Sequence, residues 1–159
     1  MATVGRRPVR IANSSGFYGD RFAAPREMLE GGPIDVLTGD YLAELTLLIL
    51  WKGREKDPAT GYAATFLRQI EDLLVLVKER GVRVVTNAGG LNPAGLARKL
   101  RELAGRLGTP LRVAHVEGDD FRSRLPELQA QGHELRHLDD GRPLSAFRRP
   151  VLTANAYLG

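Results

Sequence analysis

Short apolar runs alternate along this chain with segments whose apolar residues recur at helical spacing. The runs are rich in Val, Ile and Leu, which predicts strands, and the segments between them have the 3.6-residue period of amphipathic helices. Strands that alternate with helices predict βαβ units and a parallel sheet. We therefore predict a parallel, doubly wound, Rossmann-like α/β sheet with helices on both faces. A fragment of a (β/α) barrel is the alternative, because it would show the same alternation. The predicted strands are residues 9–13, 34–41, 82–88, 111–118 and 151–157.

The predicted helices differ in how much of their surface is apolar. Residues 62–81 carry a single apolar stripe, which is typical of a helix packed on a sheet. Residues 93–108 carry a second stripe, and Asn92 followed by Pro93 is a common way to start a helix. Residues 42–51 are apolar almost all round, which predicts a buried helix. Shorter helices are predicted to begin at Pro25 and to follow Asp120.

Composition and charge narrow the class of protein. A chain of 159 residues fits one domain over residues 1–159. The absence of cysteine excludes a disulfide scaffold, a thiolate nucleophile and a cysteine-based metal site. The net charge is +4, but the arginines are scattered along the chain and are not interleaved with aromatic residues. This pattern is typical of a solvated surface and gives no indication of a nucleic-acid partner.

Nothing in the sequence indicates export or membrane insertion. The basic N-terminal segment turns polar and glycine-rich too soon to form the apolar core of a signal peptide. The most apolar run, residues 42–51, is too short to cross a bilayer. We therefore expect a cytoplasmic protein without a membrane partner.

Small, polar and acidic residues follow every predicted strand. In an open parallel sheet, ligands bind in the crevice at the carboxyl ends of the strands, so we predict one ligand crevice at this edge. Asn87 has two interpretations, because its side chain would either contact the ligand or fix the backbone of its own loop. The predicted ligand-binding residues are Asn13, Ser14, Gly16, Asp20, Asn87, Gly89, Gly90 and Asn155.

Carboxylates at the same edge are candidates for general acid–base catalysis or for binding Mg²⁺ through oxygen. Asp40 is the first of them, because it directly ends an apolar strand, whereas Asp119 could instead cap the next helix. Gly89 and Gly90 face a helix N-terminus that could receive a phosphate or carboxylate, although no nucleotide-binding fingerprint is present. No set of metal ligands is predicted. The predicted catalytic residues are Asp40, Glu117 and Asp119.

Six motifs in this order resemble the acyclic terpene utilisation family, in its N-terminal domain: GFYGD, DYLAE, KDPATGYA, TNAGGLNP, VEGDD and ANAYLG. The resemblance covers residues 8 to 159. It implies a part in the breakdown of acyclic terpenes or related branched acids through acyl-CoA intermediates, and it leaves the reaction itself unassigned. Similar members continue beyond ANAYLG, so the resemblance also implies an N-terminal piece of a longer architecture.

Two functions are compatible with these features. In the first, the chain belongs to an enzyme that acts on a carboxylate or a CoA thioester, with the acyl compound as substrate. In the second, it is a non-catalytic subunit or scaffold of a catabolic complex. In either case we expect self-association, or contact with another subunit, through the edge formed by the last predicted strand, residues 151–157, because an uncovered edge invites pairing.

Overall fold

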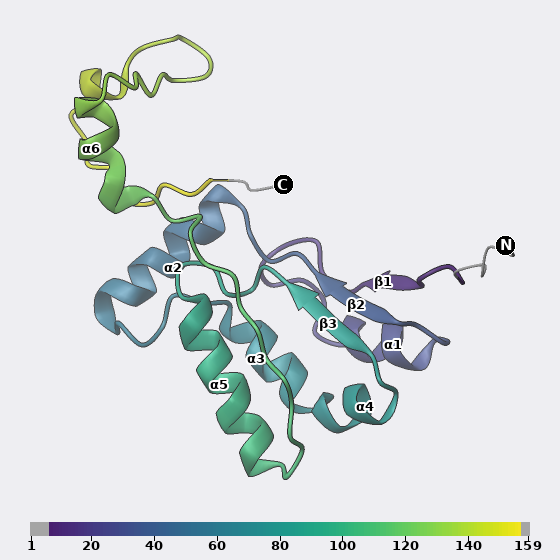
Figure 1. Cartoon of the computed structure of the whole chain (residues 1–159). Coiled ribbons are helices and arrows are strands. Elements are labelled where there is room, and N and C mark those ends of the chain that lie inside the picture. Colours follow the sequence, from purple (N-terminus) through teal and green to yellow (C-terminus); the bar gives the residue numbers. More distant parts are fainter. Residues whose placement is uncertain (1–6, 157–159) are drawn as a thin grey trace, which may run out of the picture. The chain divides into compact units, whose positions relative to one another are not determined.

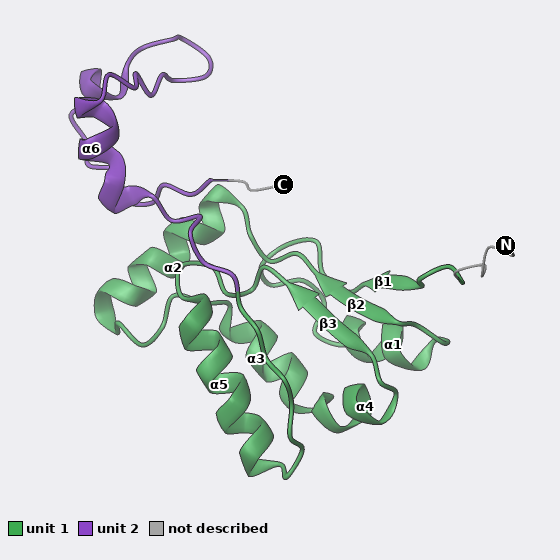
Figure 2. Cartoon of the chain, in the orientation of Figure 1, with its two compact units in different colours: residues 1–115 green, residues 116–159 purple. Residues whose placement is uncertain are grey.

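The computed structural model of the protein describes residues 7–156. The chain divides into two compact units, residues 1–115 and residues 116–159, which we call unit 1 and unit 2 (Figure 2). Each unit is described by itself below. The expectation of a single domain over the whole chain stays a prediction.

Unit 1 is built on a three-stranded parallel sheet with strand order β1-β2-β3 (Figure 1). The register places Ala12, Leu37 and Val84 side by side, so these three residues share one face of the sheet. The parallel, Rossmann-like α/β class predicted from the sequence is confirmed. The strands are β1 (Ile11–Asn13), β2 (Val36–Gly39) and β3 (Arg83–Thr86), each lying within a predicted strand.

The core of unit 1 lies between the sheet and its helices. Leu37 of β2 packs in one apolar cluster with Leu29, Phe66, Ile70 and Leu103, which come from three different helices. Helix α2 forms a second, smaller cluster with the loop after β3. The helices of unit 1 are α1 (Ala24–Glu30), α2 (Glu44–Lys56), α3 (Ala64–Glu71), α4 (Leu74–Glu79) and α5 (Pro93–Arg106).

Helices α1, α3, α4 and α5 share the core on one face of the sheet. The other face is open within unit 1, where Ile11 and Val85 are 64% and 60% exposed. The strand order explains this difference from the expectation of helices on both faces. Both crossovers step to the next strand in the same direction, and crossovers of one hand then place their helices on one side.

Two predicted helices differ from the structure in detail. Residues 62–81 form not one helix but two, α3 and α4. The Arg26 guanidinium of α1 donates a hydrogen bond to the carbonyl of Asp72 (3.2 Å). In a continuous helix this carbonyl would accept from the backbone N–H of Leu76. The helix predicted at residues 42–51 forms as part of α2, but it is buried along one side and not all round. Leu45 of α2 is 68% exposed, because only one side of this helix packs on the apolar cluster.

The predicted strand at residues 111–118 is wrong: no strand forms there. Residues 111–113 instead lie beside helices α4 and α5, where Leu111 packs against the core. The Lys78 ammonium donates to the carbonyl of Pro110 (2.7 Å), and the Arg101 guanidinium donates to that of Val113 (2.6 Å). The side chain of Arg101 therefore bonds a carbonyl within the predicted strand, and that of Lys78 bonds the carbonyl just before it.

Unit 2 consists of short elements joined by long loops. The predicted strand at residues 151–157 is also wrong over its described part, and its last residue lies outside the described residues. Within residues 151–156, Asn155 alone pairs, through an antiparallel bridge to Asp120, and a second bridge in unit 2 joins Arg136 and Pro143. The elements of unit 2 are η1 (Arg122–Arg124), α6 (Leu125–Ala130) and η2 (Leu144–Ala146), where η denotes a 3₁₀ helix.

Candidate functional site

The loops that leave β1 and β2 are fastened to each other at the carboxyl end of the sheet. The backbone N–H and the hydroxyl of Ser14 both donate to the carbonyl of Thr38 (2.9 and 3.0 Å). The Ser15 hydroxyl donates to the carbonyl of Asp40 (2.9 Å), and the Asp40 N–H donates back to the carbonyl of Ser15 (3.0 Å). Both serines are buried, so they fix the backbone on which Asp40 sits.

Asn13 and Asp20 hold the same loop from its two ends. The Asn13 amide donates to the carbonyl of Ser15 (3.0 Å) and accepts from the Thr38 hydroxyl (3.0 Å). One Asp20 carboxylate oxygen accepts from the N–H of Gly16 (2.9 Å) and the other from that of Arg21. These backbone donors hold the pKa of Asp20 below its usual range, because they stabilise the charged carboxylate.

Asn87, at the end of β3, reaches across to the loop after β2. Its Nδ2 donates to Oδ1 of Asp40 (2.6 Å), and its Oδ1 accepts from the backbone N–H of Tyr41 (2.8 Å). The same Asp40 oxygen accepts from the N–H of Leu42 (3.1 Å). Asn87 therefore does not fix its own loop. It orients an exposed carboxylate on the neighbouring one.

The other carboxylate oxygen of Asp40, Oδ2, accepts no hydrogen bond from residues 7–156. One oxygen is thus held in place while the second remains available to a ligand or a proton. Among the predicted site residues of unit 1, this is the arrangement best suited to acid–base chemistry, because the carboxylate is both positioned and accessible.

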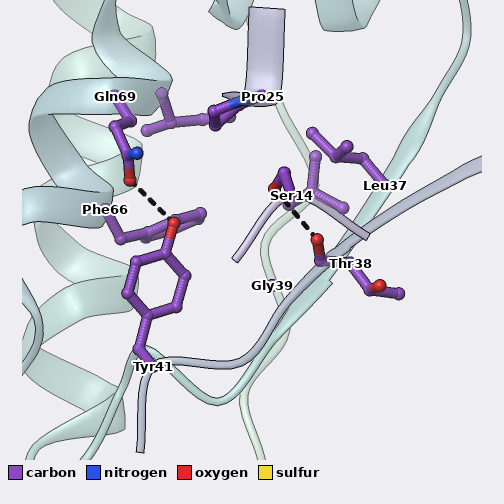
Figure 3. A pocket seen from close by; sticks show the side chains of 10 residues that line it. Ser14, Pro25, Leu37, Thr38, Gly39, Tyr41, Phe66 and Gln69 are labelled. Carbon is purple, nitrogen blue, oxygen red and sulfur yellow. Dashed lines mark hydrogen bonds between the residues drawn. The ribbon is translucent and has the colours of Figure 1, made fainter. Parts of the chain in front are cut away.

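The residue after Asp40, Tyr41, is buried and anchors the loop that carries the Asp40 carboxylate. Tyr41 is 2% exposed, and its hydroxyl donates to Oε1 of Gln69 on α3 (2.7 Å; Figure 3). Burial raises the pKa of the Tyr41 phenol to about 12, so the group stays neutral at physiological pH. The cavity beside it, lined also by Ser14 and Phe66, measures about 10 Å³, which is room for one water at most.

The two glycines after β3 lie where a larger side chain would overlap neighbouring helices. Gly90 has φ +51°, and an added Cβ would lie 2.4 Å from Cδ1 of Leu50. Its N–H donates to the carbonyl of Asn87 (3.1 Å). An added Cβ at Gly89 would lie 2.8 Å from Cβ of Pro93, the first residue of α5. These glycines therefore allow the backbone of the loop to pack closely against α2 and α5 of the same chain.

The start of α5 matches its prediction. The Asn92 side chain accepts from the N–H of Gly95 (2.9 Å), and Pro93 occupies the first turn. The Asn92 amide also donates to the carbonyl of Thr60 (2.8 Å), and the N–H of Leu91 donates to that of Gly61 (2.8 Å). The loop after β3 is thereby joined to the KDPATGYA segment.

Unit 2 brings two of its three predicted site residues together. The Asn155 amide donates to a carboxylate oxygen of Asp119 (3.0 Å), and the N–H of Ala156 donates to the carbonyl of Asp119 (2.8 Å). Asp119 caps no helix, because Phe121 is the N-cap of η1. Glu117 is exposed. That these residues share one depression with Asn13, Asp40 and Asn87 stays a prediction.

The described part of the chain offers neither a cluster of metal ligands nor a membrane-spanning helix. Within residues 7–156, no three His, Asp or Glu side chains lie close enough together to hold a metal ion. Over the same residues, no helix has the length and apolar character needed to cross a bilayer.

Sequence patterns did not reveal every residue of this constellation. Thr86 donates through its hydroxyl to the carbonyl of Gly39 (2.8 Å) and accepts from the N–H of Ala88, so it joins β2 and β3 just before Asn87. Gln69 lies on the apolar stripe of α3, where it is 3% exposed. A glutamine on an apolar helix face was the available signal for its buried partner, Tyr41.

Fold and geometry together define an open parallel α/β protein with a polar constellation at the carboxyl ends of its strands, the usual place for ligands in this class. The family model described as "Acyclic terpene utilisation family protein AtuA" matches residues 9–159. The chain therefore belongs to the acyclic terpene utilisation family. Neither the curated proteins nor the solved structures contain a significant match to it.

Proposed function

We propose that the Asp40–Asn87 pair is the reactive part of an enzyme that acts on a carboxylate or CoA thioester during the use of acyclic terpenes. The observation that carries this proposal is the bond from Asn87 Nδ2 to Asp40 Oδ1 (2.6 Å), which orients an exposed carboxylate across two strands. Family membership supplies the substrate class, because it links the chain to acyclic terpenes.

In this proposal Asp40 is the catalytic residue and Asn87 is a positioning residue. The Asp40 carboxylate would take a proton from the acyl substrate and return it later in the reaction, using Oδ2, which accepts no hydrogen bond from the described residues. Asn87 would keep that oxygen aimed outward. Asn13, Ser14, Gly16 and Asp20 would act through the backbone that they hold in place.

The remaining predicted residues enter the proposal with narrower roles. Gly89 would shape the turn beside the substrate. Gly90 would do so only through its conformation, since its N–H is already bonded to the carbonyl of Asn87. On unit 2, Asp119 and Glu117 are further catalytic candidates, and Asn155 would position Asp119 as Asn87 positions Asp40.

The test is turnover and binding of a panel of straight and methyl-branched acyl-CoA thioesters and their free acids. Asp40→Asn should lower turnover by about 100-fold or more, the usual contribution of a general acid or base. Glu55→Gln is the matched control, because it removes an exposed carboxylate from α2 and should leave turnover unchanged.

A double-mutant cycle separates positioning from folding. Asn87→Ala should lower turnover, but in the Asp40→Asn background it should add little, because the group that it positions is already gone. Fully additive effects would contradict the positioning role. An unaffected turnover in Asp40→Asn would remove the catalytic proposal itself.

The non-catalytic alternative is favoured by one observation on α2. Leu45 and Ile49 lie one turn apart and are 68% and 43% exposed, so the helix presents an apolar stripe. Such a stripe is typical of a contact with another subunit. Failure of every acyl compound to bind would favour this alternative.

A further inference from the structure

A second concentration of charge lies at the amino ends of the strands, opposite the end that carries Asp40. Three separate segments line an open depression of about 880 Å³ there, and two of them contribute two arginines each. We call Arg7, Arg10, Arg80 and Arg83, together with Asp35, the arginine basin. Its volume falls within the range of about 300–1,000 Å³ found for small-molecule sites.

Asp35 positions two of these arginines without neutralising the basin. Both of its oxygens are bonded to the guanidinium of Arg7 (2.7 and 2.9 Å) and to that of Arg10 (3.2 Å each). These contacts hold the pKa of Asp35 well below its usual range, because they stabilise the carboxylate. A guanidinium has five N–H donors, so both arginines keep donors for another acceptor.

Arg80 and Arg83 complete the basin from the other side. The Arg80 guanidinium is anchored on the carbonyl of Leu29. The backbone N–H of Arg83 donates to the carbonyl of Asp35 (3.0 Å), which sets Arg83 next to the ion pair, and its exposed side chain makes no hydrogen bond within residues 7–156. The lining thus has four guanidinium groups and one carboxylate, a formal excess of +3.

We propose that the arginine basin binds the diphosphate group of an organic ligand. Planar guanidinium groups recognise phosphate oxygens in pairs, and a single phosphate ester carries only about −1.5 to −2 at pH 7, so a diphosphate matches the excess charge better. Val9 and Ile34 line the same depression, which provides apolar surface for the organic part. This proposal is independent of the function proposed for Asp40.

Calorimetric titration at constant ionic strength tests the proposal, with inorganic pyrophosphate and ADP as probes. Both should bind the full chain, and ADP should bind more tightly because its organic part meets the apolar lining. Arg83→Gln should weaken binding of both probes by at least tenfold. This variant should fold normally, since no described group depends on the Arg83 side chain.

Arg98→Gln is the matched control, because it removes one exposed arginine from α5, outside the lining of the basin, and it should leave both affinities unchanged. Equal weakening in the two variants would show nonspecific attraction and would overturn the site. Absence of pyrophosphate binding at millimolar concentration would overturn it as well. Equal affinities for the two probes would overturn the claim that the apolar lining binds the organic part of the ligand. Asp40→Asn should change neither affinity, which separates failure of this site from failure of the catalytic proposal.

Discussion

Single side chains in this protein join segments that are far apart in sequence. Asn87 bonds Asp40 and Tyr41 on the loop after β2. Asn92 bonds Thr60 while it caps its own helix. Both asparagines use donor and acceptor at once, which a carboxylate could not do, because an ionised carboxylate only accepts.

At Asn92 the two bonds can be separated by mutation. Asn92→Ala loses the cap of α5 and the bond to Thr60, so we expect the free energy of unfolding to fall by about 1–2 kcal/mol. Asn92→Asp keeps the oxygen that accepts from Gly95 and should lose about 1 kcal/mol or less. Urea denaturation measures both. Equal losses would show that the cap contributes nothing.

The loop between β3 and α5 is the element on which the site depends most. It begins with Asn87, passes Gly89 and Gly90, and ends at Asn92. The guanidinium of Arg54, which donates to the carbonyl of Leu91, ties it to α2, and the N–H of Leu91 ties it to Gly61, after α2. Since α2 starts just after Asp40, packing of this loop sets the position of both halves of the candidate site.

Gly90 and Gly108 form a matched pair for testing this packing. Both have positive φ, +51° and +60°, but an added Cβ at Gly108 meets nothing within 4 Å. Gly108→Ala should therefore cost only the conformational penalty, about 1–2 kcal/mol. Gly90→Ala should cost about 1–3 kcal/mol more, because its Cβ would overlap Leu50. Thermal or urea unfolding gives the comparison, and equal costs would contradict the packing argument.

At the scale of the whole molecule, the buried apolar residues are concentrated in unit 1. Both apolar clusters lie before His115, and their last member is Leu111. In unit 2, Leu125 is the buried apolar residue of the described part. Cooperative unfolding depends on a shared core, so unit 1 should carry most of the stability of the chain.

A chain that ends at His115 should keep a single cooperative urea transition with a midpoint close to that of the full chain. Its denaturant slope should be smaller, because less surface is exposed on unfolding. A chain that ends at Leu100 is the control: it lacks Leu103 and Ala104 of the core and should lose the transition. Loss of cooperativity in the longer piece would show that unit 2 is needed for the core.

Local chemistry explains what the sequence revealed about this protein. Three strands, the parallel α/β class and the start of α5 at Asn92 and Pro93 were all predicted, because periodicity and capping depend on residues within a few positions of one another. Asp40 and Asn87 were proposed as site residues from their places after apolar runs, and that role stays a prediction. The positions of Asp40 and Asn87 in the sequence did not predict which residues their side chains contact.

Tertiary structure decided the remaining features. Strand order put helices α1, α3, α4 and α5 on one face, and residues 111–118 form no strand, with the carbonyl of Val113 bonded to the side chain of Arg101 instead. The bond between Asn87 and Asp40 spans 47 residues, and the arginine basin gathers three segments around Asp35. Such contacts depend on how elements pack after they form, and no local pattern encodes that packing.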